Sequence, residues 1–367
     1  MKMTRRQMCI WMGIFLGFIV RPGLCALGED VKIRVENGVT VIYNPKTPVP
    51  VPGTKTRLVL EEDLTIGQME PLFSDLVEIA VDDQGEIYAL DRKDAKISVF
   101  DSRGVLLRTI GKKGQGPGEL QGPREIRITP QKEIMITDGS TRQLVFFTLQ
   151  GQFLRNVSTA RLQFFNRPRA DSRGDIVADV SIVDQEYTAQ LKKLGPSLEP
   201  KITISSVALL KYPNFNPFFP RFTYEIGKDD IIIWGLPTKY EIHIWSREGK
   251  PLRKIVKDYD PVMITENEKK ERTEGLITSG INIIWPKSHN AYDFLFLDDE
   301  GRIFARTYEK PQGENTFYHD VFNDEGRYIA RVPLPTRPYV WKRARLCTIE
   351  EDEEGYRSIK AYKSAWE

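Results

Sequence analysis

A short pattern recurs four times along this chain, and it constrains the fold more than any other feature. An aromatic residue is followed after three residues by Gly, after two more by an aliphatic residue, and after two more by a β-branched residue. The four copies are Phe100-Gly104-Leu107-Ile110, Phe147-Gly151-Leu154-Val157, Trp245-Gly249-Leu252-Ile255 and Phe322-Gly326-Ile329-Val332. Each copy predicts a strand, a tight turn and a returning strand, because Gly accepts the positive φ that the turn requires.

The spacing of these copies predicts how many repeats the chain contains. The glycines lie 47, 98 and 77 residues apart. The gap of 98 residues corresponds to two units, so a degenerate copy is expected near residue 198, where Gly195-Pro196 begins a turn. The gap of 77 residues corresponds to one unit and an insertion.

Each hairpin follows an inner pair of apolar runs. In the first repeat these runs lie on either side of residues 82–85, and related pairs are expected to begin near Pro123, Asn166, Pro220 and Asn290. Two inner and two outer strands form one four-stranded blade of a β-propeller. Five blades are accounted for in this way between residues 68 and 335.

The two ends of the chain supply the sixth blade. Residues 343–350 and 356–366 form two strand-like runs, and residues 58–66 can add an outer strand that closes the ring and removes the open sheet edges. A hairpin over residues 31–43, with Asn37-Gly38 at its turn, is expected to pack on this closing blade. The sequence therefore predicts an all-β fold, a six-bladed β-propeller, as a single domain over residues 27–367.

Three segments resemble NHL-type repeats: residues 82–88, 100–104 and 111–119. Residues 347–356 resemble the closing blade of a six-bladed β-propeller family of exported bacterial proteins. The resemblance covers residues 31–367, and it implies the propeller fold and a location outside the cytoplasm. It leaves the activity open, since related propellers include binding platforms, lactonases and amidating lyases.

Residues 258–287 do not have the pattern of strands. Thr265 and Glu268 have the spacing of a helix capping box, so one short charged helix is expected between blades four and five.

The N-terminus is typical of an export signal. Lys2, Arg5 and Arg6 precede the apolar run of residues 9–20, and a cleavage site is expected at Ala26, which gives a signal peptide over residues 1–26. The alternatives are a short membrane anchor, lipidation at Cys25 and twin-arginine export. Cleavage would leave only Cys347, which cannot form an internal disulfide and is expected in a buried strand.

The charge balance argues against nucleic acid as a partner. The first 26 residues contain four basic and no acidic residues, so the 53 basic and 51 acidic residues of the chain become 49 and 51 after cleavage. A nucleic-acid-binding protein usually shows a strong basic excess. We expect a periplasmic or extracellular monomer without a membrane span in its mature form.

Basic residues are expected at the starts of several inner strands, where they would surround one mouth of the central tunnel. These candidate ligand-binding residues are Arg124, Arg167, Arg221, His289 and Arg343. Converging guanidinium groups favour carboxylate or phosphate ligands, because each offers a planar fork of donors. The sequence thus favours a non-enzymatic binding or scaffold protein, with a small anion or an acidic peptide or protein as its partner. The alternative is that these arginines cover loops or pair with acids such as Glu125 and Glu225.

Catalytic and metal-binding motifs are absent from the sequence, and no cofactor is expected. The three histidines, His243, His289 and His319, do not have metal-ligand spacing. The alternative function is a hydrolase or lyase of the lactonase kind with a divalent cation in the tunnel. Its candidate ligands are Glu78, Asn166, Asn290 and Asp293.

Overall fold

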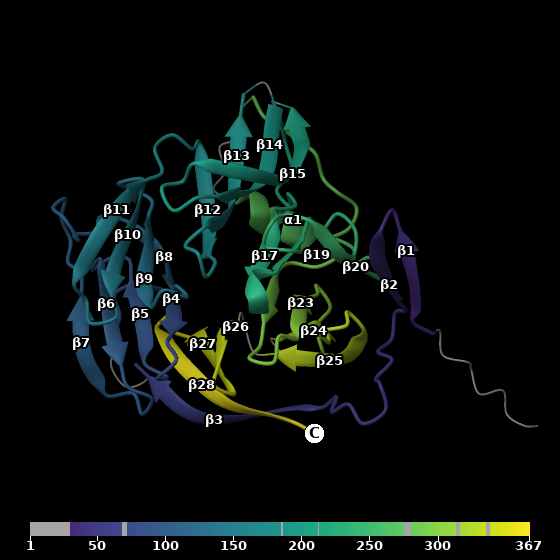
Figure 1. Ribbon diagram of the computed structural model, residues 1–367, viewed down its shortest axis with the longest axis horizontal. Coiled ribbons are helices and arrows are strands. Elements are labelled where there is room, and N and C mark those ends of the chain that lie inside the picture. The colour runs from purple at the N-terminus through teal and green to yellow at the C-terminus, as the bar shows by residue number, and fades with distance from the viewer. Residues whose placement is uncertain are drawn as a thin grey trace, which may run out of the picture.

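The computed structural model describes residues 30–67, 72–184, 186–211, 213–274, 280–312, 316–334 and 338–367. In this part of the chain, six sheets of at least four strands are arranged around one axis, as Figure 1 shows. The six-bladed β-propeller predicted from the repeats is confirmed. The signal peptide expected over residues 1–26 lies outside the described residues.

Blades one to three follow the chain in order, each with its first strand nearest the axis. Blade one contains β4 (Leu76–Val81), β5 (Ile87–Asp91), β6 (Lys96–Phe100) and β7 (Leu106–Ile110). Blade two contains β8 (Pro123–Ile128), β9 (Glu133–Asp138), β10 (Gln143–Thr148) and β11 (Phe153–Ser158). Blade three contains β12 (Phe164–Ala170), β13 (Ile176–Val183), β14 (Glu186–Leu194) and β15 (Pro200–Lys211). The degenerate copy expected near residue 198 is the turn between β14 and β15.

Blades four to six complete the ring. Blade four contains β17 (Thr223–Ile226), β18 (Ile232–Gly235), β19 (Glu241–Trp245) and β20 (Pro251–Lys257), with the 3-10 helix η1 (Lys228–Asp230) after β17. Blade five contains β22 (Leu295–Leu297), β23 (Ile303–Arg306), β24 (Phe317–Phe322) and β25 (Tyr328–Leu334). Blade six contains β26 (Pro338–Lys342), β27 (Arg345–Glu351), β28 (Arg357–Trp366) and, from the other end of the chain, β3 (Leu58–Ile66). β3 pairs antiparallel with β28, so both chain ends contribute to one blade.

The hydrophobic core is divided among the interfaces between blades. Six clusters of buried side chains occupy these interfaces, and each cluster combines residues of two consecutive blades. The cluster between blades six and one includes Ile66, Leu76 and Cys347. Cys347 is a buried strand residue, as predicted, and burial raises the pKa of its thiol to about 12. Because the interface between the last and first blades is filled like the others, apolar burial stabilises the closed ring.

The recurring glycines serve the contacts between blades as well as the turns. Gly151 has φ +92°, and a Cβ atom at this position would lie 2.7 Å from Cγ1 of Ile110 in the preceding blade. The other three copies have equally close contacts with the outer strand of the blade before them. These contacts are Gly104 with Leu64 at 2.8 Å, Gly249 with Ile202 at 2.9 Å and Gly326 with Ile255 at 2.8 Å.

The N-terminal hairpin does not pack on the closing blade, so that expectation was wrong. Its strands β1 (Lys32–Glu36) and β2 (Val39–Asn44) extend blade four, because β2 pairs in parallel with β20. Asn44 fixes this position: its amide donates to the Gly326 carbonyl oxygen at 3.0 Å, and its side-chain oxygen accepts from the Tyr328 backbone N–H at 2.8 Å. The hairpin therefore covers the outer edge of blade four and is anchored to blade five.

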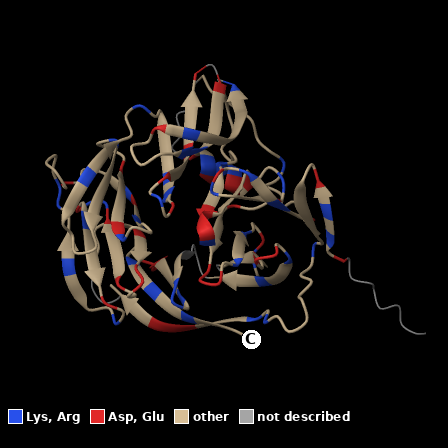
Figure 2. Ribbon diagram, viewed as in Figure 1, with Lys and Arg blue, Asp and Glu red and all other residues tan. Residues whose placement is uncertain are grey.

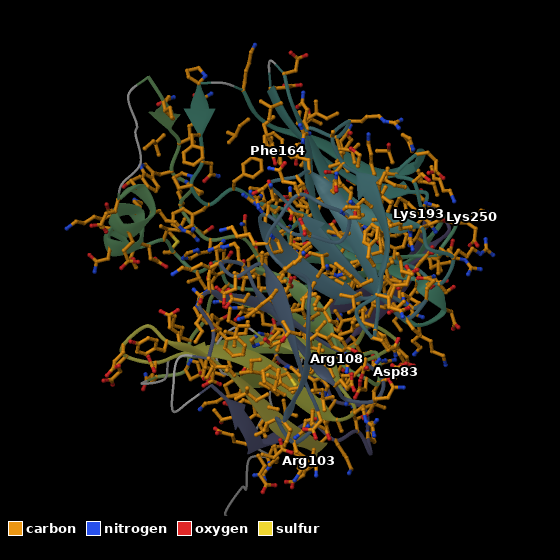
Figure 3. The ribbon with its side chains drawn as sticks, turned by 90° about the vertical axis from the view of Figure 1, so that its left-hand side faces the viewer. Asp83, Arg103, Arg108, Phe164, Lys193 and Lys250 are labelled. Carbon is orange, nitrogen blue, oxygen red and sulfur yellow. The ribbon has the colours of Figure 1, made fainter. Side chains whose placement is uncertain are left out.

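The insertion between blades four and five forms the expected helix, α1 (Glu266–Thr273), with the capping box of Thr265 and Glu268. Two short strands, β16 (Asn214–Phe215) and β21 (Asn282–Ile283), pair in parallel nearby. Figure 3 shows α1, β16 and β21 projecting from one face of the propeller, on the left of the view. The described part of the chain has no helix that is long and apolar enough to cross a membrane.

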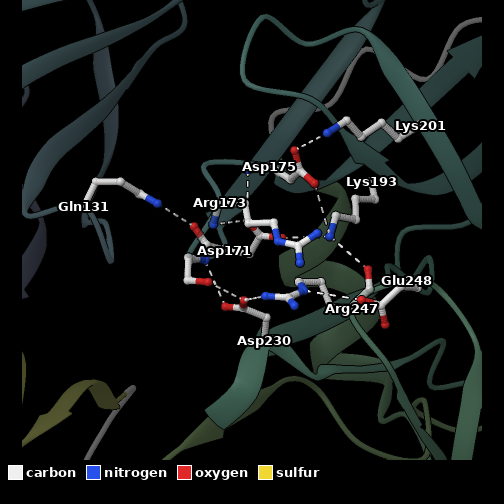
Figure 4. A network of polar contacts seen from close by, with 10 residues as sticks. Gln131, Asp171, Arg173, Asp175, Lys193, Lys201, Asp230, Arg247 and Glu248 are labelled. Atoms are coloured by element: carbon white, nitrogen blue, oxygen red, sulfur yellow. Dashed lines mark hydrogen bonds and ion pairs between the residues drawn. The ribbon is translucent and has the colours of Figure 1, made fainter.

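A buried polar network joins blades two, three and four (Figure 4). Lys193, which is only 4% exposed, forms ion pairs with Asp171 at 2.7 Å and Asp175 at 3.3 Å. Its ammonium group also donates to the Arg247 carbonyl oxygen in blade four, at 2.9 Å. Gln131 of blade two donates to the Asp171 carbonyl oxygen at 2.9 Å. The network fixes the positions of three blades relative to one another on the face opposite α1.

Candidate functional site: the central channel

Two cavities lie along the propeller axis, one toward each face. The smaller, of about 190 Å³, is lined by residues near the starts of the inner strands, and the larger, of about 490 Å³, by residues near their ends. Both cavities share four lining residues: Arg127, Arg169, Glu225 and Phe296. These four residues lie where the two cavities adjoin, and we call them the channel wall.

Two ion pairs stabilise the channel wall. Arg169 is 8% exposed and donates two hydrogen bonds to Glu225, at 2.8 and 2.9 Å. Arg127 donates to the Glu78 carboxylate, which also accepts from the Ile126 backbone N–H at 3.0 Å. Burial alone would raise the pKa of Glu225, but the Arg169 guanidinium outweighs burial and holds the pKa below its usual range.

The structure brings two of the five predicted residues, Arg124 and Arg167, to the smaller cavity. Arg124 is the second residue of β8, and its side chain has no ion pair or hydrogen bond within the part of the chain that the structure describes. Its guanidinium lies against the backbone of Gly139, where an added Cβ atom would come within 2.3 Å of Nε. Arg167 has φ +53° at an irregularity in the pairing of β12 with β13.

Arg221 and His289 lie near the same face but outside the smaller cavity. Arg221 precedes β17 and lines a separate pocket of about 260 Å³ with Tyr187, Phe215 and Phe219. His289 lies six residues before β22, where Nε2 contacts the Glu268 carboxylate of α1 at 3.0 Å. The sequence placed His289 at the start of the inner strand of blade five, and this placement was wrong.

Arg343 lies on the opposite face, so its expected place beside the other arginines was also wrong. The inner strand of blade six is β26, and Arg343 follows its last residue in the turn to β27, with φ +55°. Its guanidinium donates to the Asp83 carbonyl oxygen at 2.7 Å. Figure 3 shows Asp83 on the right of the view, away from α1.

The sequence argument did not identify the charged residues that form the channel wall. Arg127 and Arg169 lie two or three residues beyond the predicted Arg124 and Arg167 in the same inner strands. Acidic and basic residues occur throughout the propeller, as Figure 2 shows, so charge alone does not identify the residues near the axis. The available signal was their position within strands that form the innermost layer.

The alternative interpretation had the predicted arginines cover loops or pair with acids such as Glu125 and Glu225. Arg343 does cover a loop, because it donates to the Asp83 carbonyl oxygen. Glu225 binds Arg169 instead. Glu125 lines the smaller cavity, and its buried Oε2 has no hydrogen-bond partner among the described residues.

Two candidate ligands of the alternative metal site are engaged by arginine. Glu78 binds Arg127, and Asp293 binds Arg306. Across the described residues, no group of three or more His, Cys, Asp or Glu side chains has an arrangement suited to a metal ion.

Comparison with known proteins identifies relatives by sequence and by fold. Residues 68–172, which include blades one and two, match the model of a family described as "6-bladed beta-propeller". The chain is 27% identical over 113 residues to Protein brain tumor of Drosophila melanogaster. This alignment covers 30% of the chain and 11% of that protein, so the match spans about a tenth of its length.

Two solved structures from Bacteroides have the same fold. One is a protein of Bacteroides fragilis described as exported, with a TM-score of 0.55 and 11% identity, covering 89% of this chain and 99% of that one. The other is a member of the DUF4221 family from Bacteroides vulgatus, with a TM-score of 0.53 and 13% identity, covering 86% of this chain and all of that one. At this level of identity the comparison establishes the shared fold alone.

Proposed function

We propose that this chain is an exported, non-enzymatic binding protein that holds an anionic ligand in the smaller cavity of its channel, with Arg124 and Arg167 as the anion-binding residues. The observation that carries the proposal is the charge of this cavity. Four guanidinium groups and three carboxyl groups line it, and two of the carboxylates are already paired with Arg127 and Arg169.

Arg124 is the strongest single candidate for ligand contact. Its side chain has no ion pair or hydrogen bond to the described residues, and its guanidinium packs against Gly139 in an adjoining pocket of about 160 Å³ that Arg124 and Glu125 also line. A charge-assisted hydrogen bond from a guanidinium contributes about 1.5–3 kcal/mol. The cavity suits a small anion or the acidic tip of a peptide, because its volume of about 190 Å³ is too small for a folded partner to enter.

Export is supported by the N-terminal signal pattern and by the similarity in fold to a Bacteroides fragilis protein described as exported. We propose a periplasmic or extracellular location and a monomeric state. Size-exclusion chromatography and fractionation of the cells that produce the protein test these two points.

Isothermal titration calorimetry tests anion binding with a panel of probes: acetate, benzoate, succinate, inorganic phosphate and a tetraglutamate peptide. We expect Arg124→Gln and Arg167→Gln each to weaken the best-bound probe by about tenfold or more, which corresponds to about 1.4 kcal/mol or more. Affinity should also fall as salt rises, because the interaction is between charges.

Arg343→Gln is the matched control. It removes the same charge from a residue with nearly the same left-handed φ, 55° against 53° for Arg167, but on the opposite face. An equal loss of affinity in Arg343→Gln, or unchanged affinity in both Arg124→Gln and Arg167→Gln, would contradict the proposal.

A further inference from the structure

Glu125 differs from the other carboxyl groups of the smaller cavity. Both Glu225 oxygens accept hydrogen bonds from Arg169, and both Glu78 oxygens accept from Arg127 and the Ile126 backbone. The Glu125 Oε2 atom is buried and accepts no hydrogen bond from any residue that the structure describes. A carboxylate oxygen that is buried without a donor is costly, and this cost favours the protonated form of the group.

The titratable and charged groups that face Glu125 come from four of the six inner strands. From β4 there is Glu78; from β8, Arg124 and Arg127; from β12, Arg167 and Arg169; from β17, Tyr224 and Glu225. Burial first, and then the Glu78 charge, raise the pKa of Glu125, while the arginines oppose this shift. Arg127 and Arg169 are engaged by Glu78 and Glu225, which weakens their effect on Glu125.

The opposite side of the cavity is apolar. Phe294, Leu295 and Phe296 of blade five line it, and Val77 of blade one adds a further aliphatic surface. Phe294 and Leu295 are 5% and 1% exposed, so their positions are fixed by packing. A ligand that fills this cavity meets charged groups on one side and hydrocarbon on the other, which an inorganic anion does not match.

We propose that the cavity selects an organic carboxylate with a small apolar body, and that Glu125, as a neutral carboxylic acid, donates a hydrogen bond to the ligand carboxylate beside Arg124. This inference rests on the proposed anion-binding function and adds the ligand class and the protonation state of the site. Ligand binding then holds a proton on Glu125. At a pH where Glu125 is ionised in the ligand-free protein, ligand binding takes up one proton from solvent.

The test measures benzoate binding by calorimetry from about pH 5.5 to about pH 9, a range in which benzoate itself stays ionised. At the acidic end of the range we expect constant affinity. Once Glu125 ionises in the ligand-free protein, affinity should fall by about tenfold per pH unit, because one proton is linked to binding. In the pH range of this loss, the observed enthalpy should differ between buffers of unequal ionisation enthalpy. Inorganic phosphate should bind at least about tenfold more weakly than benzoate.

Glu125→Gln supplies the second arm. The Gln amide retains a hydrogen-bond donor but cannot ionise, so benzoate binding should lose both its pH dependence and its proton uptake. The wild-type measurements test the inference on their own if this variant does not fold.

The outcomes separate this inference from the proposed function. Benzoate binding that depends on Arg124 but not on pH, or phosphate binding as tight as benzoate binding, would overturn the inference and leave the proposed function standing. Retained pH dependence in Glu125→Gln would also overturn it. Failure of the whole panel to bind would overturn both.

Discussion

Removal of the Glu225 charge tests whether the channel wall depends on buried ion pairing. Arg169 is 8% exposed, and its two hydrogen bonds to Glu225 measure 2.8 and 2.9 Å. Glu225→Gln keeps one acceptor oxygen but leaves the guanidinium without its counter-charge. Loss of one partner from a buried ion pair costs about 3–5 kcal/mol. Since the amide retains one hydrogen bond, we expect the free energy of unfolding to fall by about 3 kcal/mol.

The pair of Glu133 with Arg155 is the matched control. It has the same two-bond geometry, with both distances at 2.7 Å, but the Arg155 side chain is 45% exposed. An exposed ion pair contributes about 0–1 kcal/mol. Glu133→Gln should therefore destabilise the protein by less than about 1 kcal/mol.

Urea unfolding, followed by tryptophan fluorescence, measures both losses. The comparison requires an unchanged dependence of the unfolding free energy on urea concentration. Equal losses in Glu225→Gln and Glu133→Gln would refute the view that burial of Arg169 makes the channel-wall pair different.

Three glycine substitutions differ in the space around their Cβ positions. Gly151→Ala should destabilise the protein by about 2–4 kcal/mol, because it combines backbone strain with overpacking against Ile110. Gly301→Ala, with φ +79° and open space at its Cβ position, should cost about 1 kcal/mol. Urea unfolding compares them, and equal losses would contradict the interblade contact. Gly139→Ala should displace Arg124 and weaken binding of the anionic probes with little loss of stability, and calorimetry that finds unchanged affinity would argue against a ligand contact by Arg124.

The blades could be predicted from sequence because each one repeats the same local chemistry. The turn glycines and the flanking apolar runs act over a few residues, which is the range that a sequence pattern reports. The contact of Gly151 with Ile110 links two blades across 41 residues, and it adds a reason for the glycine beyond the turn.

The N-terminal hairpin shows the limit of this reasoning. Its turn at Asn37-Gly38 was predicted from two residues, and β1 pairs with β2 around it. Its partner blade depends on Asn44, whose side chain binds Gly326 and Tyr328 more than 280 residues away. No local pattern distinguishes this edge from the edge of the closing blade.

The arginine positions failed for a related reason. Consecutive strands of a blade run in opposite directions, so the start of the second strand lies at the face opposite to the start of the inner strand. Arg343 was assigned to the start of an inner strand, but it follows the end of β26. A displacement of about five residues, the length of β26, thus moved it from one mouth of the channel to the other.

The near balance of charge in the chain, with 53 basic and 51 acidic residues, conceals the local charge of the cavity. Four arginines face three glutamates there, and if Glu125 carries a proton the balance becomes two positive charges. At physiological salt the field of these charges is screened within about 8 Å. An anion outside the channel therefore experiences a mixed surface, and only a group that enters the cavity meets the excess of guanidinium. For a protein in a medium rich in anions, this geometry favours ligands that combine a carboxylate with a shape able to pass the mouth.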